Sequence, residues 1–213
     1  MNIRRLPCLL LVLLVLPLAA CSSLFNVQRT PFTIYSPKLS APAATAPASL
    51  VDWQLAVETP LASDALDTSR IVVMPSPGVI EVYPGARWSD SAPALLRNLI
   101  VQGFENSHRI VGVGSAASGL RADYALAIEV RDFQLEMDGG THAAIHLQVR
   151  LLDYTTSRVL AARSFEASSP AASTNAAAAF GAFQEALNRI VPELVEWTLR
   201  EGETQHGKAH RPG

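Results

Sequence analysis

The most chemically diverse stretch of the sequence is YPGARWSDSAPALLR, residues 83–97. Its fifteen residues include a tyrosine, two arginines, a tryptophan, two serines and an aspartate, which could supply a nucleophile, an acid and a binding surface. The order of these residues favours a structural role instead. Pro84 and Gly85 are typical of a turn, and the Ser-Asp-Ser run at residues 89–91 is typical of a helix start. We therefore expect a strand ending at Tyr83, a turn and a helix.

Arg87 and Trp88 are the residues of this stretch that a strand, a turn and a helix start do not explain. In one interpretation, Trp88 packs where the helix meets the sheet, and Arg87 is solvated or stacked. In the other, the two side chains form a contact surface for a partner protein or for a second copy of this chain, which would make the protein a homo-oligomer. The sequence leaves both interpretations open.

Two pairs of histidines have the spacing that would bind a metal ion on a helix. His142 and His146 fall in a predicted strand, where a rise of roughly 3.3 Å per residue separates them by about 13 Å, too far to share one ion. His206 and His210 fall in the polar C-terminal segment, residues 199–213, which we expect to be disordered. We therefore predict no metal ion and no cofactor.

The glycine-rich segment GVGSAASG, residues 112–119, follows a predicted strand as a phosphate-binding loop would. Its spacing matches neither the dinucleotide-binding pattern nor the P-loop, so we interpret it as a plain loop. The sequence contains no G-x-S-x-G motif of the serine hydrolases. It also places no histidine to activate Ser89 or Ser91. The residues themselves therefore do not predict an enzyme.

The first residues of the chain have the layout of a secretory signal peptide. Arg4 and Arg5 form the positively charged region, residues 8–18 form an apolar run, and small residues follow. A membrane-spanning helix needs about 20 apolar residues, so this run is too short to be one. We therefore predict a signal peptide over residues 1–20.

The sequence LAAC that ends at Cys21 resembles the bacterial lipobox. This resemblance implies that a diacylglycerol is joined to the Cys21 sulfur and that the chain is cut just before this residue. Each buried CH₂ group contributes roughly 0.8 kcal/mol to membrane affinity, so two or more acyl chains form a firm anchor. Ser22 resembles the residue found in outer-membrane lipoproteins of Gram-negative bacteria. We predict that residues 21–29 tether the protein to the periplasmic face of the outer membrane.

The remaining composition excludes several classes of protein. Removal of Arg4 and Arg5 with the signal peptide makes the formal charge more negative than the −2 of the whole chain, so nothing favours nucleic-acid binding. Cys8 leaves with the signal peptide and Cys21 carries lipid. No cysteine then remains for a disulfide, a zinc site or a thiol nucleophile.

The strand patterns predict an antiparallel sheet. Short strands are expected at residues 31–36 and 53–58, on either side of a loop rich in proline and alanine at residues 37–50. A hairpin is expected around PSPG, and RIVGV at residues 109–113 is typical of another strand. Between residues 124 and 167, apolar residues alternate in three strands, but the phase slips within the first. This slip predicts a β-bulge at Arg131 and Asp132.

Helical spacing predicts two main helices that pack on one face of this sheet. The first begins after residues 89–91 and ends near residue 106, and the second runs from about residue 174 to residue 200. Pro192 lies inside the second helix, which therefore either bends there or is two helices. The fold class is α+β, with a single domain over residues 30–198 behind the lipidated N-terminal tether. One stripe of the second helix faces the sheet: Phe183, Leu187, Ile190, Leu194 and Trp197.

These elements resemble a known family, the ABC-type transport auxiliary lipoproteins. The family includes the third component of the paraquat-inducible locus and the lipoprotein partners of mammalian-cell-entry (MCE) transporters. The resemblance runs from about Thr30 to Trp197, and its most specific part is Tyr83, Arg87 and Trp88 followed by an acidic residue and a proline. The insertion-like APAATAPASL departs from the family pattern. The other carriers are the lipobox, FTIY, LDTSRIVVMPSPGVIEVYPGARWSDSAPALL, ADYALAIEVRDFQLE, RVLAARSFE and the terminal helix.

The resemblance implies a role in transport without catalysis. MCE systems move lipids or other hydrophobic molecules between the inner and outer membranes. An inner-membrane permease and ATPase supply energy, an MCE-domain protein spans the periplasm, and the auxiliary lipoprotein acts at the outer membrane. The implied partner is therefore the MCE-domain protein, and no catalytic residue is carried over. The alternatives are an envelope assembly or structural lipoprotein that chaperones or plugs an outer-membrane protein and, third, a lipid-modifying enzyme.

Overall fold

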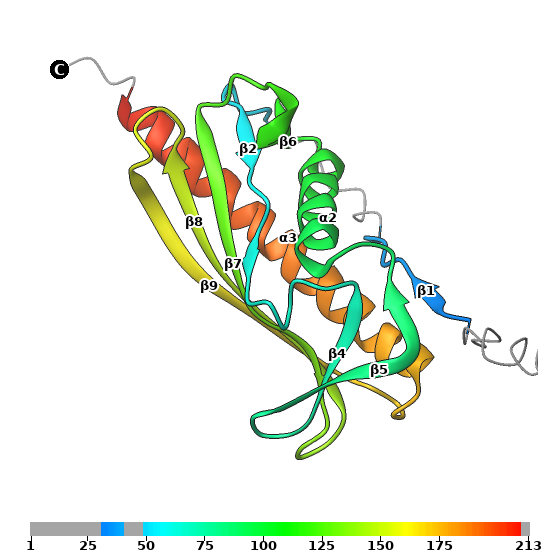
Figure 1. Cartoon of the computed structure of the whole chain (residues 1–213). Coiled ribbons are helices and arrows are strands. Elements are labelled where there is room, and N and C mark those ends of the chain that lie inside the picture. Colours follow the sequence, from blue (N-terminus) through cyan, green and yellow to red (C-terminus); the bar gives the residue numbers. More distant parts are fainter. Residues whose placement is uncertain (1–30, 41–48, 210–213) are drawn as a thin grey trace, which may run out of the picture. The chain divides into compact units, whose positions relative to one another are not determined.

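The computed structural model describes residues 31–40 and 49–209. The signal peptide, Cys21 and the tether at residues 21–29 lie outside these ranges, as does most of the proline-rich loop. The described residues form the α+β fold that the sequence predicts, with one large sheet and two main helices, α2 (Ala92–Ser107) and α3 (Ala176–Ala209), on one of its faces (Figure 1). None of the helices in these ranges is long and apolar enough to cross a membrane.

The central strand of the sheet is β7, the longest described strand, which pairs along both of its edges. Along one edge β8 pairs antiparallel over the full length of β7, and along the other β2, β3 and β4 pair in parallel one after another. The strand β9 lies beyond β8, β5 lies beyond β4, and the short strands β1 and β6 add parallel pairs that the sequence did not predict. In chain order, the described strands are β1 (Thr33–Tyr35), β2 (Leu55–Val57), β3 (Leu61–Ala62), β4 (Arg70–Ser76), β5 (Val79–Trp88), β6 (Val113–Ser115), β7 (Tyr124–Glu136), β8 (His142–Asp153) and β9 (Val159–Pro170).

The predicted β-bulge in β7 is confirmed. Val130 pairs with Leu147 and Asp132 pairs with His146, so Arg131 is an extra residue in the ladder. Because side chains alternate along a strand, one inserted residue moves the apolar set back to the same face. Val130 and Phe133 are both buried although they are three positions apart, an odd step that would place them on opposite faces of a regular strand.

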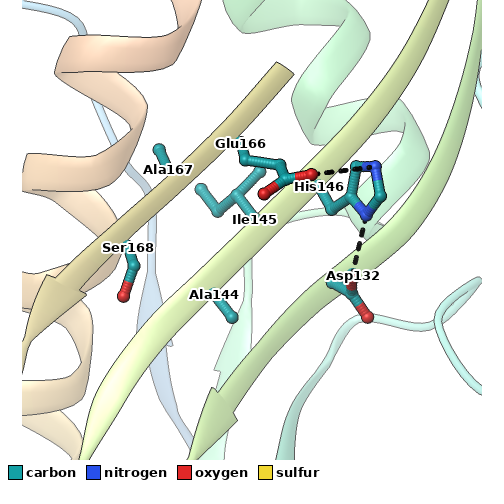
Figure 2. Close-up of a pocket in the computed structure, with 7 residues that line it drawn as sticks. All are labelled: Asp132, Ala144, Ile145, His146, Glu166, Ala167 and Ser168. Atoms are coloured by element: carbon teal, nitrogen blue, oxygen red, sulfur yellow. Dashed lines mark ion pairs between the residues drawn. The ribbon is translucent and has the colours of Figure 1, made fainter. Parts of the chain in front are cut away.

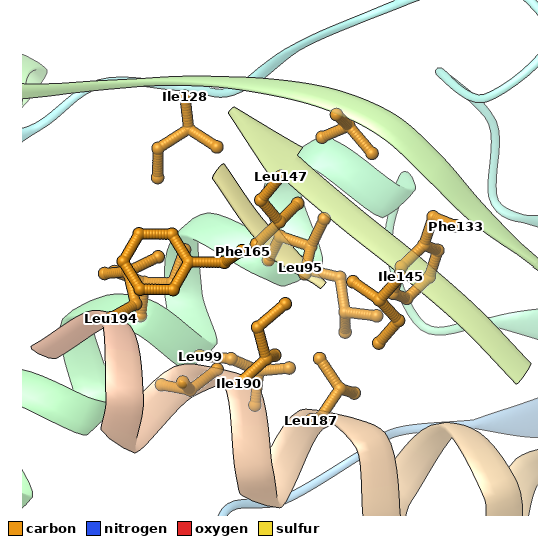
Figure 3. Packing of buried hydrophobic residues seen from close by; sticks show 14 of the residues in the cluster. Leu95, Leu99, Ile128, Phe133, Ile145, Leu147, Phe165, Leu187, Ile190 and Leu194 are labelled. Carbon is orange, nitrogen blue, oxygen red and sulfur yellow. The ribbon is translucent and has the colours of Figure 1, made fainter. Parts of the chain in front are cut away.

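The hydrophobic core lies between the sheet and the two helices. Along β8, partly exposed and buried residues alternate from His142 to Leu152, and the opposite, polar face carries no helix in the described residues. Each large apolar side chain that is fully buried stabilises the fold by roughly 1.5–3 kcal/mol. All five residues of the predicted stripe of α3 are buried. Figure 3 shows side chains from each layer in this core: Leu95 and Leu99 of α2, Ile145, Leu147 and Phe165 of the sheet, and Leu187, Ile190 and Leu194 of α3.

The two helices approach each other closely at Gly103 of α2. A Cβ atom at this position would lie 2.6 Å from Cγ1 of Val191 and 3.2 Å from Cγ2 of Val195 in α3. The first distance is shorter than van der Waals contact allows, so an added Cβ atom would require Val191 or one of the helices to move. The absence of a side chain at Gly103 therefore permits this close approach.

The prediction of a turn at Pro84 and Gly85 is wrong, because β5 continues through both residues to Trp88. The strand is irregular there. Arg70 pairs with Arg87 while Val72 pairs with Val82, which leaves more residues on β5 than on β4 between the two pairs. Proline has no N–H to donate, and Gly85 has a φ of +67°, so the ladder is interrupted without a reversal of the chain. The predicted hairpin around PSPG, residues 75–78, is confirmed, with Ser76 paired to Val79.

The interpretation of residues 112–119 as a plain loop is also wrong. They contain strand β6 and the short 3₁₀ helix η3 (Ala116–Ser118), and the strand predicted at residues 109–113 lies at Val113–Ser115 instead. The cause is a tertiary contact, because β6 pairs in parallel with β2, with Leu55 opposite Val113. A pairing with a distant strand overrides the local preference of the glycines and serines for a loop.

The prediction of a disordered tail from residue 199 is wrong for the described part of that segment. A single helix, α3, runs from Ala176 to Ala209 with Pro192 inside it, so it is not split in two. Its last turns are held to the domain by three contacts. Leu199 is fully buried, Gly202 packs on the ring of Trp53, and Nε2 of His206 lies 3.3 Å from Oδ1 of Asp52.

We predict opposite effects for two glycine substitutions in α3. A Cβ atom at Gly202 would lie 2.4 Å from Cζ2 of Trp53, whereas one at Gly181 meets no atom within 4 Å. Gly202→Ala should lower the free energy of unfolding by about 1–3 kcal/mol because the site is overpacked. Gly181→Ala should raise it by up to about 1 kcal/mol because alanine favours the helix. Urea unfolding of both variants measures the difference, and equal stabilities would contradict the packing of Gly202 on Trp53.

Candidate functional site

Residues 83–97 form a junction between the sheet and the helices. Trp88 is 1% exposed, and its ring centroid lies 5.0 Å from that of Phe183 in α3 and 5.6 Å from that of Phe133 in β7. The hydroxyl of Tyr83 donates a hydrogen bond to the carbonyl of Thr174, just before α3. Both aromatic residues therefore fix β5 to other elements of the fold.

The burial of Trp88 agrees with the interpretation in which it packs at the helix–sheet junction. Arg87 is exposed, and adjacent residues of a strand point to opposite faces. A direct contact with a partner through this pair would therefore involve the guanidinium of Arg87 and not the ring of Trp88. That contact stays a proposal.

The serines and the aspartate at residues 89–91 start α2, as predicted. Ser91 is the N-cap residue, although its side chain makes no capping hydrogen bond. The backbone compensates, because the N–H of Ala92 donates to the carbonyl of Thr68 at 3.0 Å. Oγ of Ser89 lies 3.3 Å from Oδ2 of Asp90 and 3.5 Å from Oγ of Ser36, just after β1. These residues position a helix and face no general base.

A second polar cluster, which the sequence did not reveal, lies on the open face of the sheet around His146 (Figure 2). Nδ1 of His146 lies 3.3 Å from Oδ2 of Asp132, and Nε2 lies 2.7 Å from Oγ of Ser164 and 3.6 Å from Oε1 of Glu166. Asp132, His146 and Glu166 come from β7, β8 and β9 and line an open hollow of about 250 Å³. The pairing of the three strands brings these residues together, so no short motif in the sequence predicts the cluster.

The order of atoms in this cluster, carboxylate to imidazole to hydroxyl, is that of a serine nucleophile with its base. Two observations argue against acyl transfer here. The carboxylate of Glu166 shares Nε2 with the Ser164 hydroxyl, so it adds negative charge where an oxyanion would form. The side chain of Glu166 is also 72% exposed, so the site does not exclude water. The contacts suit a hydrogen-bonded cluster that ties three strands together.

On the rest of the open face, acidic side chains pair with histidine or arginine. Oε2 of Glu136 lies 3.3 Å from Nε2 of His142, and Glu129 lies 3.6 Å from Arg150 and 3.7 Å from Arg131. The side chains are partly exposed, so each pair contributes about 0–1 kcal/mol. His142 and His146 have separate partners, as expected from their spacing along the strand. In residues 31–40 and 49–209, no three side chains of the kinds that hold metals are grouped as a metal site.

Two groups in the described residues have a clearly shifted pKa, and both belong to the turn end of the sheet. The N–H and the hydroxyl of Thr156, with the N–H of Thr155, donate to Oδ1 of Asp153 and lower the pKa of its carboxyl group. Burial raises the pKa of the Tyr124 hydroxyl. These groups close the turn between β8 and β9 and pack the end of β7. Neither lies in the hollow around His146.

The exposed aliphatic residues of β5 form a surface of a different kind. Val79, Ile80 and Val82 are 44%, 53% and 40% exposed, although they alternate between the two faces of the strand. Nothing in the sequence pattern indicates that both faces of this strand reach solvent. Their exposure follows from the hairpin of β4 and β5, which extends past the two helices (Figure 1).

Comparison with known proteins matches nearly the whole described domain. The family of ABC-type transport auxiliary lipoprotein components matches residues 35–195. The crystal structure of protein XCC0632 from Xanthomonas campestris is 38% identical, with a TM-score of 0.77 over 82% of this chain and 99% of that chain. Protein bll6063 of Bradyrhizobium diazoefficiens is 34% identical over 176 residues, which are 81% of this chain. The matched region is 45% of the length of that relative, so this chain spans about half of it.

We predict that substitutions of Trp88 and Arg87 have different consequences. Trp88→Ala should lower the free energy of unfolding by about 3–5 kcal/mol because it empties the junction of β5, β7 and α3. Arg87→Ala should change it by less than about 1 kcal/mol because the side chain is exposed. Urea unfolding followed by circular dichroism tests both. A Trp88→Ala protein that is as stable as the wild type but fails to bind its partner would instead support a contact surface.

Proposed function

The chain belongs to the family of ABC-type transport auxiliary lipoprotein components, and on that premise we propose that it is a non-enzymatic part of an MCE-type ABC transport system. In this proposal, the system moves lipids or other hydrophobic molecules across the periplasm. The observation that carries the proposal is the extent of the family match. Residues 35–195 include every described strand after β1 and all of α2, together with most of α3.

The packing of the domain supports a docking role. The space between the sheet and the helices is filled by side chains in direct contact, such as Phe133 and Phe183 with ring centroids 5.0 Å apart. A lipid bound to the described domain would therefore lie on its surface. The polar cluster around His146 lacks the features that acyl transfer needs. We infer that the domain acts by binding other components of the transporter, and that it needs no cofactor.

The proposed partner is the MCE-domain protein, whose permease and ATPase lie in the inner membrane. We place the lipoprotein at the periplasmic face of the outer membrane, anchored through lipid on Cys21, with Ser22 favouring that membrane. A chain extends by at most about 3.5 Å per residue, so the segment between Cys21 and Thr33 reaches roughly 40 Å. The domain would therefore stay close to the membrane surface while it meets a partner that spans the periplasm.

Mild crosslinking in cells followed by purification of the tagged lipoprotein should recover the MCE-domain protein of its transporter. The reason is that a docking component must spend time in contact with the partner. Mass spectrometry identifies the recovered protein, and an unrelated outer-membrane lipoprotein with the same tag is the control. Repeated failure to recover the partner, while a known complex is recovered in parallel, would count against the transport function.

Membrane fractionation should separate the wild type from two variants of the anchor. Cys21→Ala, expressed behind a signal peptide whose removal does not require Cys21, should leave the domain folded but move it from the outer-membrane fraction to the soluble fraction, because the lipid supplies the membrane affinity. Ser22→Asp should keep the lipid and shift the protein to the inner membrane. Retention of Cys21→Ala in the membrane after carbonate washing would show that the anchor argument is wrong.

A further inference from the structure

We propose that the outer edge of β5, at residues 79–83, accepts an extended strand of the MCE-domain partner. One edge of β5 pairs with β4. On the other edge, β1 pairs only with Ala86, Arg87 and Trp88. Within the described part of the chain, the outer edge of β5 before Ala86 therefore has no strand beside it. Such an edge presents unpaired N–H and C=O groups that can bind another strand.

Three side chains along this edge are aliphatic, as in strands that are buried, but here they are exposed. Val79, Ile80 and Val82 are 40–53% exposed to solvent, and they point to both faces of the hairpin. Aliphatic side chains on both faces of one strand are typical of strands that are covered on both sides. A partner strand would place cross-strand neighbours beside them and remove part of this apolar area from water, at about 25 cal/mol for each Å² removed.

The combination of an open backbone edge and aliphatic side chains favours a strand over a lipid surface as the occupant. A lipid layer would shield Val79, Ile80 and Val82 but would leave the N–H and C=O groups of the edge without hydrogen bonds, which costs several kcal/mol for each group in hydrocarbon. An added strand satisfies both requirements. The existing pair of β1 and β5 shows that this edge already accepts a parallel strand farther along.

The ends of the free edge define the length of the segment that binds. Pro84 has no N–H, and Gly85 has a φ of +67°, so regular pairing stops after Tyr83. At the other end, Gly78, with a φ of +79°, belongs to the hairpin turn. The acceptor is therefore about five residues long, a length typical of strands.

Glu81 adds a preference for charge. It is exposed in the middle of the free edge, and within the described residues it makes no ion pair. A basic residue directly opposite it in a bound strand would contribute roughly 0.2–1 kcal/mol. The expected ligand is an extended segment with aliphatic side chains at alternate positions and a lysine or arginine near its centre.

The identity of the partner rests on the transport function proposed above, whereas the open edge does not. The test is hydrogen exchange of the full lipoprotein in detergent, alone and in complex with the MCE-domain protein. Amides of residues 79–83 that face outward should exchange at least about tenfold more slowly in the complex, because they then donate to the added strand. Amides of β9, at the opposite edge of the sheet, should not change.

Two lysine substitutions supply the matched comparison. Ile80→Lys places a charge on the proposed acceptor edge, and Val159→Lys places one on an aliphatic residue of β9 with similar exposure, 49% against 53%. Ile80→Lys should weaken binding to the MCE-domain protein at least about tenfold, and Val159→Lys should leave it within about twofold. Circular dichroism and thermal unfolding confirm that both variants are folded before binding is measured.

Each other outcome overturns the proposal in a different way. A complex that forms without protection of residues 79–83, or that tolerates Ile80→Lys, removes the edge as the docking site and leaves the transport function standing. No complex at all contradicts both. Protection of residues 79–83 by vesicles of phosphatidylethanolamine and phosphatidylglycerol, without partner, would assign the edge to a lipid surface. Protection that grows with lipoprotein concentration alone would assign it to a second copy of the chain.

Discussion

The pairing of β7 on both edges is the constraint on which the rest of the structure depends. Its antiparallel ladder with β8 fixes which residues face the helices, and its parallel contacts with β2, β3 and β4 bring distant segments into one sheet. The bulge at Arg131 makes this possible, because without it either Val130 or Phe133 would face solvent. The same bulge sets Asp132 opposite His146, so one inserted residue shapes both the core and the polar cluster on the open face.

The parts of this fold that the sequence predicts are those set by local periodicity. The alternation in β7 and β8, the slip at Arg131 and the stripe of α3 need no knowledge of distant partners. The parallel pairing of the short strands could not be predicted in the same way, although β1 and β2 were expected as strands. The three residues of β6 become a strand only beside β2. The prediction that the chain is disordered from residue 199 was wrong for a related reason. The end of α3 has a polar composition, and the few contacts that hold it, such as Gly202 on Trp53, are made with residues that are distant in the sequence.

The candidate sites show the same division. Residues 89–91 carry their helix-start signal in their own types, and the structure agrees with it. The cluster of Asp132, His146 and Glu166 spans three strands and has no signal in any one of them. Its geometry also shows why contact alone does not define a function. A serine, an imidazole and a carboxylate lie in the order of a hydrolase, yet a second carboxylate and open solvent oppose that chemistry. The transport assignment consequently depends on the family match across the domain.

The two edges of the sheet differ in how they are protected, and this difference bears on how the domain meets other proteins. On β9, the guanidinium of Arg163 lies 4.7 Å from the ring centroid of Phe165 and pairs with Glu193 of α3. This edge strand therefore carries charge and contacts a helix. On β5, Pro84 and Gly85 interrupt the ladder, but the five residues before them carry three exposed aliphatic side chains and one acid. Exposed edges of this kind invite aggregation unless they are shielded. The short edge of β5 remains prone to aggregation as long as it is exposed. This property is consistent with an edge that a binding partner covers in the functional complex.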